Sequence, residues 1–361
     1  MRLIEKVWFQ GHSAKWWMVP LLLPLMVVFA GLSFIRRLAY KIGLLQAVKV
    51  SVPVVVVGNI GVGGNGKTPV TLYLVEKLTE KGLKVGVVSR GYGSNAPYYP
   101  YQVHAESTAE QAGDEPLLIF QRSGVNVVIG SDRVAGCQLL IEQGCDLIIA
   151  DDGLQHYRLA RDFEFVVVDG KRLFGNGLLL PAGPLRETKQ RINHANCVIV
   201  NGESSWLKQA HNLDIPALTM QLTANKVVNV KTGKSVKLSD FLAQYLASEY
   251  KVNALAGIGD PKRFFNTLEQ YGFTIARAQG FVDHQTFTVD DLQSFSEDLP
   301  LLMTEKDAVK CASFAQENYW YLPVDAVFLH TSSVENITAV ITELVKLVDE
   351  HDARDSNELK R

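Results

Sequence analysis

The residues from Gly61 to Thr68 have the types and the spacing of a phosphate-binding loop. They fit the pattern G-x-x-x-x-G-K-[ST], in which glycines let the backbone curl so that successive N–H groups point at phosphate oxygens. In this pattern Lys67 reaches the β- and γ-phosphates of a nucleotide, and the Thr68 hydroxyl ligates Mg²⁺. The loop therefore predicts binding of a nucleoside triphosphate with its magnesium ion. The residues expected to contact the nucleotide are Gly61, Val62, Gly63, Gly64, Asn65, Gly66, Lys67, Thr68 and Pro69.

The segments on either side of this loop favour a phosphate site over an ordinary glycine-rich turn. Before it runs an apolar, largely β-branched stretch, Val52 to Val57, which is typical of a buried strand. After it, Tyr73, Leu74 and Leu78 recur at helical spacing. A helix that opens at Thr68 adds the positive end of its dipole to the loop.

Two pairs of neighbouring acids are candidates for metal binding or proton transfer. Asp151 and Asp152 end an apolar stretch, Leu147 to Ala150, and phosphate-loop enzymes use such carboxylates to hold or orient Mg²⁺. Asp114 and Glu115 stand directly before a proline, where the chain is not in the middle of a helix. Spacing alone favours a helix cap at Asp114 over a catalytic role.

Other polar residues near strand ends allow more than one interpretation. Gln155 follows the Asp151-Asp152 pair and offers an amide to the same region. Arg186 ends an apolar, glycine-rich loop and could meet a phosphate, although a solvated surface arginine fits equally well. His284 fits an ordinary surface histidine. The Asn225-Lys226 pair is followed by two valines, so it does not supply the N-K-x-D segment that a GTPase would need.

Composition excludes some classes of protein. A chain of 361 residues with 47% hydrophobic side chains can form two domains. Its net charge of -2 argues against a general nucleic-acid binder. The four cysteines, Cys137, Cys145, Cys197 and Cys311, lack the spacing of a metal site or a disulfide framework, so we expect small core residues in a reducing compartment.

A long apolar segment, Trp16 to Ile35, contains 20 residues and no charge, the length of a helix that crosses a bilayer. Arg36 and Arg37 follow it, and basic residues there agree with a cytosolic location for the rest of the chain. A cleaved signal peptide has a shorter apolar region, and a soluble core helix is usually shorter too. Pro20 and Pro24 leave open a kinked helix that dips into one leaflet.

The first fifteen residues predict a short helix that precedes this segment. Leu3, Ile4, Val7 and Trp8 share one side of it, which suits a helix lying in the membrane surface. A surface helix of the soluble part is the alternative.

The fold class follows from apolar strands that alternate with helical segments. We expect an α/β protein with a mostly parallel sheet of the phosphate-loop type, helices on both faces, and a second, smaller α/β domain. Ligands of such sheets bind at the carboxyl ends of the strands. The strand candidates are 85–89, 125–129, 147–150, 163–168 and 198–200, followed in the second domain by 252–256, 274–278, 301–304 and 319–324.

The expected organisation comprises a membrane-anchoring segment and two domains. We expect the anchor over residues 1–37, the phosphate-loop domain over 38–216, a β-hairpin linker over 217–238, the second domain over 239–348 and a disordered tail over 349–361. A helix is expected from Pro261 to Tyr271 in the second domain.

Several of these motifs together resemble the tetraacyldisaccharide 4'-kinase family, membrane-associated enzymes that phosphorylate the lipid A disaccharide precursor in Gram-negative bacteria. The proline directly after Lys67-Thr68 and the Asp-Asp-Gly-x-Gln-His run at 151–156 are the distinctive features. The resemblance also covers the apolar N-terminus and the segments 58–69, 89–93, 113–116, 130–133, 181–187, 281–284 and 303–310.

The resemblance implies an ATP- and Mg²⁺-dependent lipid kinase of lipopolysaccharide biosynthesis at the cytoplasmic face of the inner membrane. It implies that Asp114 is the general base on the 4'-hydroxyl, paired with His284, which reverses the preference for a cap. It places Lys67 in catalysis, and Thr68, Glu115, Asp151 and Asp152 around Mg²⁺. Substrate or phosphate contacts are implied for Arg133, Gln155 and Arg186, and also for Arg90 and Tyr92. The expected partners are an acylated disaccharide phosphate and membrane lipid.

Two alternatives remain on sequence grounds. A membrane-tethered regulatory NTPase would turn over ATP without a lipid acceptor. A non-catalytic membrane scaffold with a vestigial loop would tolerate loss of Lys67.

Overall fold

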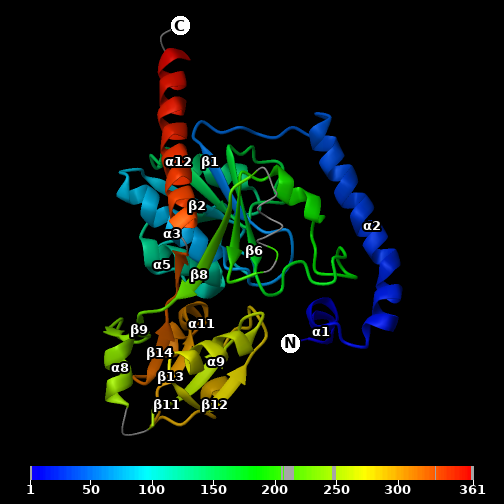
Figure 1. The fold of residues 1–361 in the computed structure, drawn as a ribbon. Coiled ribbons are helices and arrows are strands. Elements are labelled where there is room, and N and C mark those ends of the chain that lie inside the picture. The colour runs from blue at the N-terminus through cyan, green and yellow to red at the C-terminus, as the bar shows by residue number, and fades with distance from the viewer. Residues whose placement is uncertain (1, 205, 207–214, 246–248, 330, 359–361) are drawn as a thin grey trace.

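The computed structural model describes residues 2–204, 206, 215–245, 249–329 and 331–358. Within these residues the chain forms two sheets, one of nine strands and one of six, with helices packed against both (Figure 1). This architecture confirms the expected α/β fold with a smaller second unit. We call the nine-stranded sheet with its helices the large unit, and the six-stranded sheet with its helices the small unit.

The sheet of the large unit is parallel except at its two edges. In spatial order its strands are β15 (Asp325–Phe328), β8 (Ala217–Thr223), β7 (Cys197–Asn201), β6 (Phe163–Asp169), β1 (Val54–Gly58), β5 (Leu147–Asp151), β2 (Val85–Ser89), β4 (Asn126–Ile129) and β3 (Tyr101–Gln102). The chain winds outward from β1 first on one side and then on the other. Loops after β1 and its neighbours therefore meet at one edge, where ligands of such sheets bind.

The apolar runs of the central strands are explained by burial on both faces. Val55 and Val57 of β1 face a core shared with α3 (Lys67–Glu80), α5 (Asp114–Ser123) and α12 (Thr331–Glu358). Val54 and Val56 face the opposite core, which α6 (Arg133–Glu142) covers. The four cysteines are buried and free in these cores and in the small unit, which confirms their expected role.

The small unit has the strand order β10 (Ser235–Lys237), β9 (Lys226–Asn229), β14 (Tyr319–Leu322), β13 (Leu301–Thr304), β11 (Lys251–Ala256) and β12 (Thr274–Gly280). The last four strands are parallel. Its helices are α8 (Leu238–Gln244), α9 (Pro261–Gln270), α10 (Val289–Leu292), α11 (Glu305–Cys311) and the 3₁₀ helix η3 (Ala312–Phe314). The large unit also contains α4 (Ala109–Ala112) and the 3₁₀ helix η1 (Lys189–His194).

The domain boundaries differ from those expected. Residues 217–223 form β8 of the large sheet rather than the first strand of a linker, and the hairpin that does exist, β9 with β10, belongs to the small sheet. The chain then returns, because β15 pairs with β8 and α12 packs on the large unit. Local patterning shows that a segment is a strand but not which distant strand it pairs with, so the boundary at 348 was misplaced.

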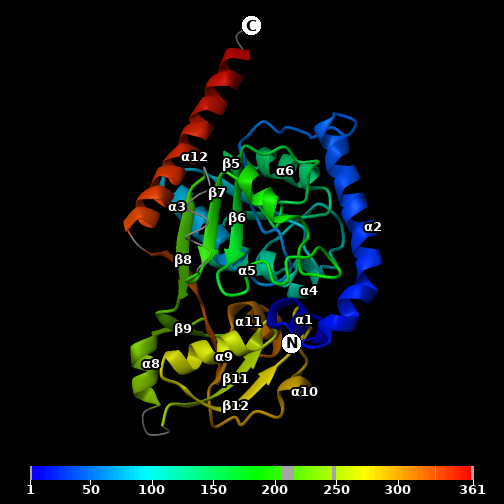
Figure 2. The same cartoon turned by 45° about the vertical axis from the view of Figure 1, so that its right-hand side comes forward.

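Residues 349–358 of the expected disordered tail are helical instead. The helix α12 continues to Glu358, and residues 359–361 lie outside the described part of the chain. Apolar side chains at helical spacing, Ile337, Ile341, Leu344 and Val348, hold its first half on the sheet. Figure 2 shows its second half extending beyond the rest of the molecule.

Two helices precede the large unit. The first, α1 (Leu3–Gln10), buries Val7, and its Trp8 Nε1 donates to the carbonyl of Pro181 at 3.2 Å. The second, α2 (Lys15–Lys41), is long and apolar enough to cross a membrane, and its most apolar stretch buries no residue against the protein. It lies on the opposite side of the large sheet from α12 (Figure 2).

Candidate functional site

The phosphate-binding loop connects β1 to α3, as expected from the sequence. The N–H of Val62 donates to the carbonyl of Pro184 at 2.9 Å, which fixes the start of the loop. Gly66 has φ of 94°, and a Cβ there would lie 2.7 Å from the amide nitrogen of Asn201, so only glycine fits. Among the described residues, the N–H groups of Gly63 to Gly66 donate to no other part of the chain. They are therefore available to an anionic ligand.

The turn after β5 places two carboxylates beside Lys67. Asp151 lies opposite Val57 of β1 in the sheet register, and its Oδ1 accepts from the Thr71 hydroxyl of α3 at 3.1 Å. The next residue, Asp152, has φ of 47°, and its Oδ1 lies 3.6 Å from the Lys67 Nζ. The loop lysine and both acids thus meet at the carboxyl edge of the central strands.

The two acids carry opposite pKa shifts. Burial, and after it the charge of Glu115, raise the pKa of Asp151 to about 7 in spite of Lys67. Burial also acts on Asp152, but Lys67 and Arg186 outweigh it and lower the pKa to about 2. Asp151 is therefore a buried carboxyl among other acids whose charge is only partly compensated.

A third group of polar residues joins this turn from the loop that ends at Glu187. Arg186 Nη1 donates to both carboxylate oxygens of Asp152 at 3.1 and 3.2 Å. Gln155 donates from Nε2 to the carbonyl of Asn59 at 3.0 Å and to Glu187 at 2.8 Å. Glu187, which is 3% exposed, fixes this corner.

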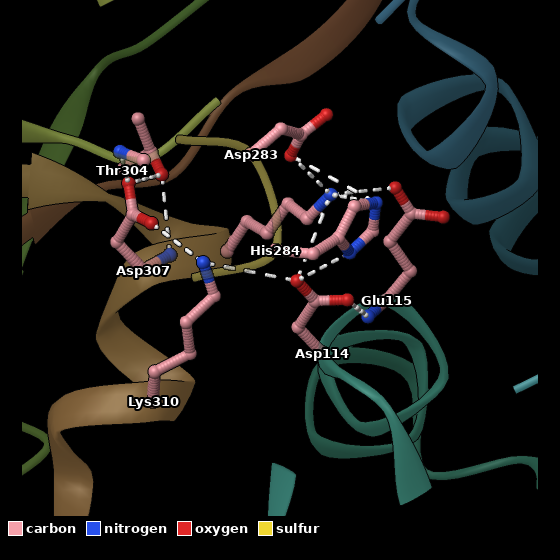
Figure 3. Close-up of polar contacts among 9 residues, drawn as sticks. Asp114, Glu115, Asp283, His284, Thr304, Asp307 and Lys310 are labelled. Atoms are coloured by element: carbon pink, nitrogen blue, oxygen red, sulfur yellow. Dashed lines mark hydrogen bonds and ion pairs between the residues drawn. The ribbon is translucent and has the colours of Figure 1, made fainter. Parts of the chain in front are cut away.

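The Asp114 carboxylate meets His284 across the two units (Figure 3). Asp114 is the first residue of α5 in the large unit, and His284 lies in the loop after β12 in the small unit. Asp114 Oδ2 is 3.2 Å from His284 Nδ1, while Oδ1 accepts from the Glu115 N–H at 3.0 Å. Among the described residues Oδ2 has no well-aligned hydrogen-bond donor, although it is buried. Asp114 Oδ2 can therefore accept a hydrogen bond from a further donor.

Charges around this contact keep Asp114 ionised. Burial by itself raises the pKa of the Asp114 carboxyl, but contact with His284 and the charges of Lys306 and Lys310 outweigh it and lower the pKa to about 2. The contact with Asp114 raises the pKa of His284, against the effect of burial. The two groups thus form an anion next to a readily protonated imidazole.

The remaining predicted substrate contacts are placed differently from one another. Arg133 is 2% exposed, and its Nη1 donates to the carbonyls of Val88 and Asp151 at 2.8 and 3.0 Å. It therefore links the carboxyl ends of β2 and β5. Tyr92 is exposed, and its ring centroid lies 5.0 Å from that of His284. Arg90 is exposed and forms no ion pair or hydrogen bond with any other described residue.

The residues predicted to hold Mg²⁺ fit that ion in chemistry. No three His, Cys, Asp or Glu side chains in the described residues are grouped closely enough to bind a metal by themselves. Mg²⁺ in nucleotide enzymes usually takes one or two carboxylates and completes its shell with phosphates and water. The raised pKa of Asp151, beside Glu115 and Asp152, marks a buried excess of negative charge that a cation would relieve.

Sequence reasoning missed the lysines of the small unit. Lys306 and Lys310 lie on α11, with Nζ atoms 3.6 and 3.8 Å from Asp114 Oδ2. A signal was present, because Thr304 and Asp307 have the spacing of a helix cap after an apolar strand. That pattern places the start of a helix at a sheet edge, yet nothing in it names the partner across the units.

The fold and the site together define a phosphate-loop nucleotide enzyme in which a second unit brings a histidine to a buried carboxylate. A family model described as tetraacyldisaccharide-1-P 4'-kinase, LpxK, matches residues 18–342. The chain belongs to this family.

Named relatives match the sequence of this chain along most of their own length. The tetraacyldisaccharide 4'-kinase of Colwellia psychrerythraea is 57% identical over 91% of this chain and 94% of its own. That of Histophilus somni is 46% identical over 94% of this chain and 98% of its own. The LpxK of Aquifex aeolicus, whose structure was solved in complex with ATP, superposes with a TM-score of 0.72 at 28% identity, over 90% of this chain and 99% of that one.

Proposed function

We propose that this protein transfers the γ-phosphate of ATP to the 4'-hydroxyl of a tetraacyl disaccharide 1-phosphate, as the names of its relatives describe. The observation that carries the proposal is the buried Asp114 carboxylate, held against His284 of the small unit with one oxygen free to accept a hydrogen bond. A nucleotide hydrolase that uses only water has no need for such an acceptor site built from two units.

Asp114 acts as the base on the acceptor. Its free oxygen orients the hydroxyl and takes its proton as the new O–P bond forms and the bond from the γ-phosphorus to the β,γ-bridging oxygen breaks. ADP leaves with the bonding electron pair. A carboxyl pKa of about 2 keeps Asp114 ionised at neutral pH and so able to accept the proton of the hydroxyl. His284 keeps the carboxylate oriented.

The loop residues bind and neutralise the nucleotide. The free amides of Gly63 to Gly66 and the Lys67 ammonium face the phosphates. Thr68, Glu115, Asp151 and Asp152 would hold Mg²⁺, which when bound would neutralise negative charge on the phosphates. Arg186 and Gln155 contact phosphate or acceptor groups, and Tyr92 and Arg90 extend this contact at the exposed rim.

The acceptor explains the N-terminal helix. A tetraacylated sugar stays in the bilayer, since each buried CH₂ contributes about 0.8 kcal/mol. We infer that α2 attaches the enzyme to the inner membrane, with both units on the cytoplasmic side where ATP is present. At 1.5 Å per residue α2 is about 40 Å long, more than the roughly 30 Å of the hydrocarbon core.

The test is an assay of the full-length protein in detergent micelles with labelled ATP and the disaccharide precursor. We expect label on the lipid, and ATP turnover that depends on the lipid. ATP turnover at the same rate without lipid would instead support a membrane-tethered regulatory NTPase. Lys67→Ala should abolish transfer; a fully functional Lys67→Ala protein would support a scaffold.

A further inference from the structure

The Lys306 ammonium is the point where the charges of both units converge. Its Nζ lies 3.0 Å from Glu115 Oε1 and 3.1 Å from Asp283 Oδ1, both at hydrogen-bond distance. It lies 3.4 Å from His284 Nε2 and 3.6 Å from Asp114 Oδ2. The side chain is 15% exposed. One buried lysine therefore contacts both residues of the Asp114–His284 pair and an acid next to each of them.

These contacts cross the boundary between the units. Asp114 and Glu115 begin α5 of the large unit, whereas Asp283 and His284 belong to the small unit (Figure 3). At such short distances, the three carboxylates would repel one another if no cation lay among them. The compact ammonium, with three donors on one atom, satisfies acids that approach from different directions, which a planar guanidinium does not do as well.

The structure fixes the position of Lys306 from the opposite side. The side chain of Asp307 is fully buried, and its Oδ2 accepts from the Gly257 N–H at 2.9 Å and from the Thr304 hydroxyl at 2.6 Å. Thr304 Oγ1 in turn accepts from the Asp307 N–H at 3.2 Å and so caps α11. The first turn of α11, which carries Lys306, is thus locked to the sheet of the small unit.

His284, in contrast, depends on its neighbours. Its φ of 63° lies in the left-handed region, which costs free energy for a residue other than glycine and persists only where contacts enforce it. Its imidazole lies against Lys306, Asp114, Asp283 and the ring of Tyr92. Removing Lys306 takes away the contact that belongs to the rigid part of its own unit.

We propose that Lys306 is a positioning residue for phosphoryl transfer. Its ammonium links α5 to the loop of Asp283 and His284, and this link holds Asp114, Glu115 and His284 in their reactive arrangement. The proposal rests on the function proposed above. Lys306 does not exchange the proton and does not bind the nucleotide.

The first experiment measures kcat and both KM values of Lys306→Met in the lipid-dependent assay. Methionine keeps most of the length of the side chain and removes the charge. We expect kcat to fall by about 10²-fold, the usual effect of misplacing a reacting group by about 1 Å, with KM for ATP little changed. Lys306→Arg keeps the charge and should recover part of this loss. A raised KM for ATP with an unchanged kcat would identify a phosphate contact and overturn the proposal.

Arg122→Met is the matched control. Arg122 also joins α5 to later parts of the chain, since its guanidinium contacts Glu305 at 2.8 Å and Asp325, but it lies at the other end of α5. If Lys306 only holds the units together, the two variants should lose similar amounts of activity for similar losses of thermal stability. We expect a large fall in kcat for Lys306→Met alone.

A double variant separates this proposal from the proposed function. If Lys306 acts through Asp114, then Lys306→Met should lower kcat little further in an Asp114→Asn protein, because residues that act as a unit are not additive. Equal effects in both backgrounds would overturn the positioning role. Wild-type turnover by Asp114→Asn alone would instead remove the base, and with it the mechanism proposed above.

Discussion

The Asp114 carboxylate is buried, ionised and held from two sides, yet one of its oxygens lacks a well-aligned donor among the described residues. A buried polar atom without a hydrogen bond costs free energy, and such atoms in native proteins call for an explanation such as a catalytic role. It stands at the first position of α5, where a carboxylate also interacts well with the helix dipole. A helix terminus and a catalytic site therefore coincide at one residue.

Asp114→Asn should lower the rate of phosphoryl transfer by about 10² to 10⁴, the usual contribution of a general base, while ATP affinity stays near that of the wild type. His284→Ala should lower the rate less, since it removes only the orienting partner. Single-turnover kinetics with a parallel measurement of ATP binding would check both. The reverse order of the two effects would exchange the roles of the two residues.

Asp151 should make stability depend on pH. Its pKa is raised to about 7, above the ordinary value of 3.8, so the folded state binds more protons than the unfolded state between these values. Stability is therefore lost as pH rises from about 3.8 to about 7, and the loss is complete above that range. Asp151→Asn removes this loss and still accepts a hydrogen bond from Thr71. In buffer without nucleotide or metal, we expect a higher Tm than the wild type at pH 8 and a smaller difference between the two proteins at pH 5.

Calorimetry at the two pH values would measure this difference. A gain of 1 kcal/mol corresponds to roughly 1 to 2 °C in a chain of 361 residues. Thr71→Val is a useful comparison, since it removes the hydrogen-bond donor and keeps the carboxyl. An Asp151→Asn protein that is less stable at pH 8 would show that the carboxylate is well compensated without metal.

At the scale of single residues, the sequence predicted what lies within one motif. The loop from Gly61 to Thr68 and the acids at 151 and 152 carry their chemistry in local spacing. Lys306 could not be found this way, because its partner Glu115 lies 191 positions earlier in the chain. Arg133, for which the family resemblance implies a substrate or phosphate contact, donates to buried carbonyls, and this contact too is not visible in the local sequence.

At the scale of elements, α1 and α2 have separate roles. The α1 helix is docked, because Trp8 bonds to the carbonyl of Pro181 and the Phe9 ring lies under the Arg172 guanidinium at 5.3 Å. The α2 helix exposes large apolar residues along its length, Leu21, Leu25, Val28 and Leu32 among them. Exposed apolar surface of this extent is typical of sites that contact a membrane or another protein.

Deleting residues 1–36 should weaken membrane attachment much more than ATP binding. The deletion also removes the contacts of α1, so a second variant, Leu25→Lys with Leu32→Lys, keeps α1 and alters only exposed positions of α2. Both proteins should shift from the membrane pellet to the supernatant on ultracentrifugation. Unchanged pelleting of both would show that attachment depends on another surface.

The elements were predictable where a strand is buried on both faces, as for β1, β2 and β5 to β7. The assignment of a strand to its sheet was not predictable where the strand it pairs with lies far away in the sequence. Ala217–Thr223 alternates like a hairpin strand, and only the pairing of Val198 with Ala217 and of Met220 with Phe328 assigns it to the large sheet. Loop closure over long segments leaves no local pattern in the sequence.

At the scale of the whole molecule, ion pairs hold the units together near the phosphate loop. Arg172 Nη2 lies 3.1 Å from Asp260 Oδ2, and Arg263 donates to Asp169, which is 1% exposed. Gly259 of the small unit approaches the backbone of Gly64. The structure therefore represents an arrangement in which the units are close together.

Asp260→Asn with Arg263→Gln should loosen this arrangement, because both variants remove a charge from a pair that crosses the boundary. Spin labels on cysteines introduced at exposed Lys81 and Lys237 would report the separation of the units, since the native cysteines are buried. We expect a longer and broader distribution of distances. Lys262→Gln on the same helix is the control. An unchanged distribution would show that the remaining contacts suffice.

The return of the chain to its starting sheet has a further consequence. Thr223 of β8 pairs directly with Asp325 of β15, so the entry and exit of the segment 224–324 are adjacent. The small unit is thus inserted between the two strands of one hairpin. A tight turn could replace it and join these strands without a change in the strand order. His284 and Lys306 would be removed with the small unit, whereas Asp114 would remain in the large unit. The two units, made as separate polypeptides, would then each carry half of the proposed catalytic site.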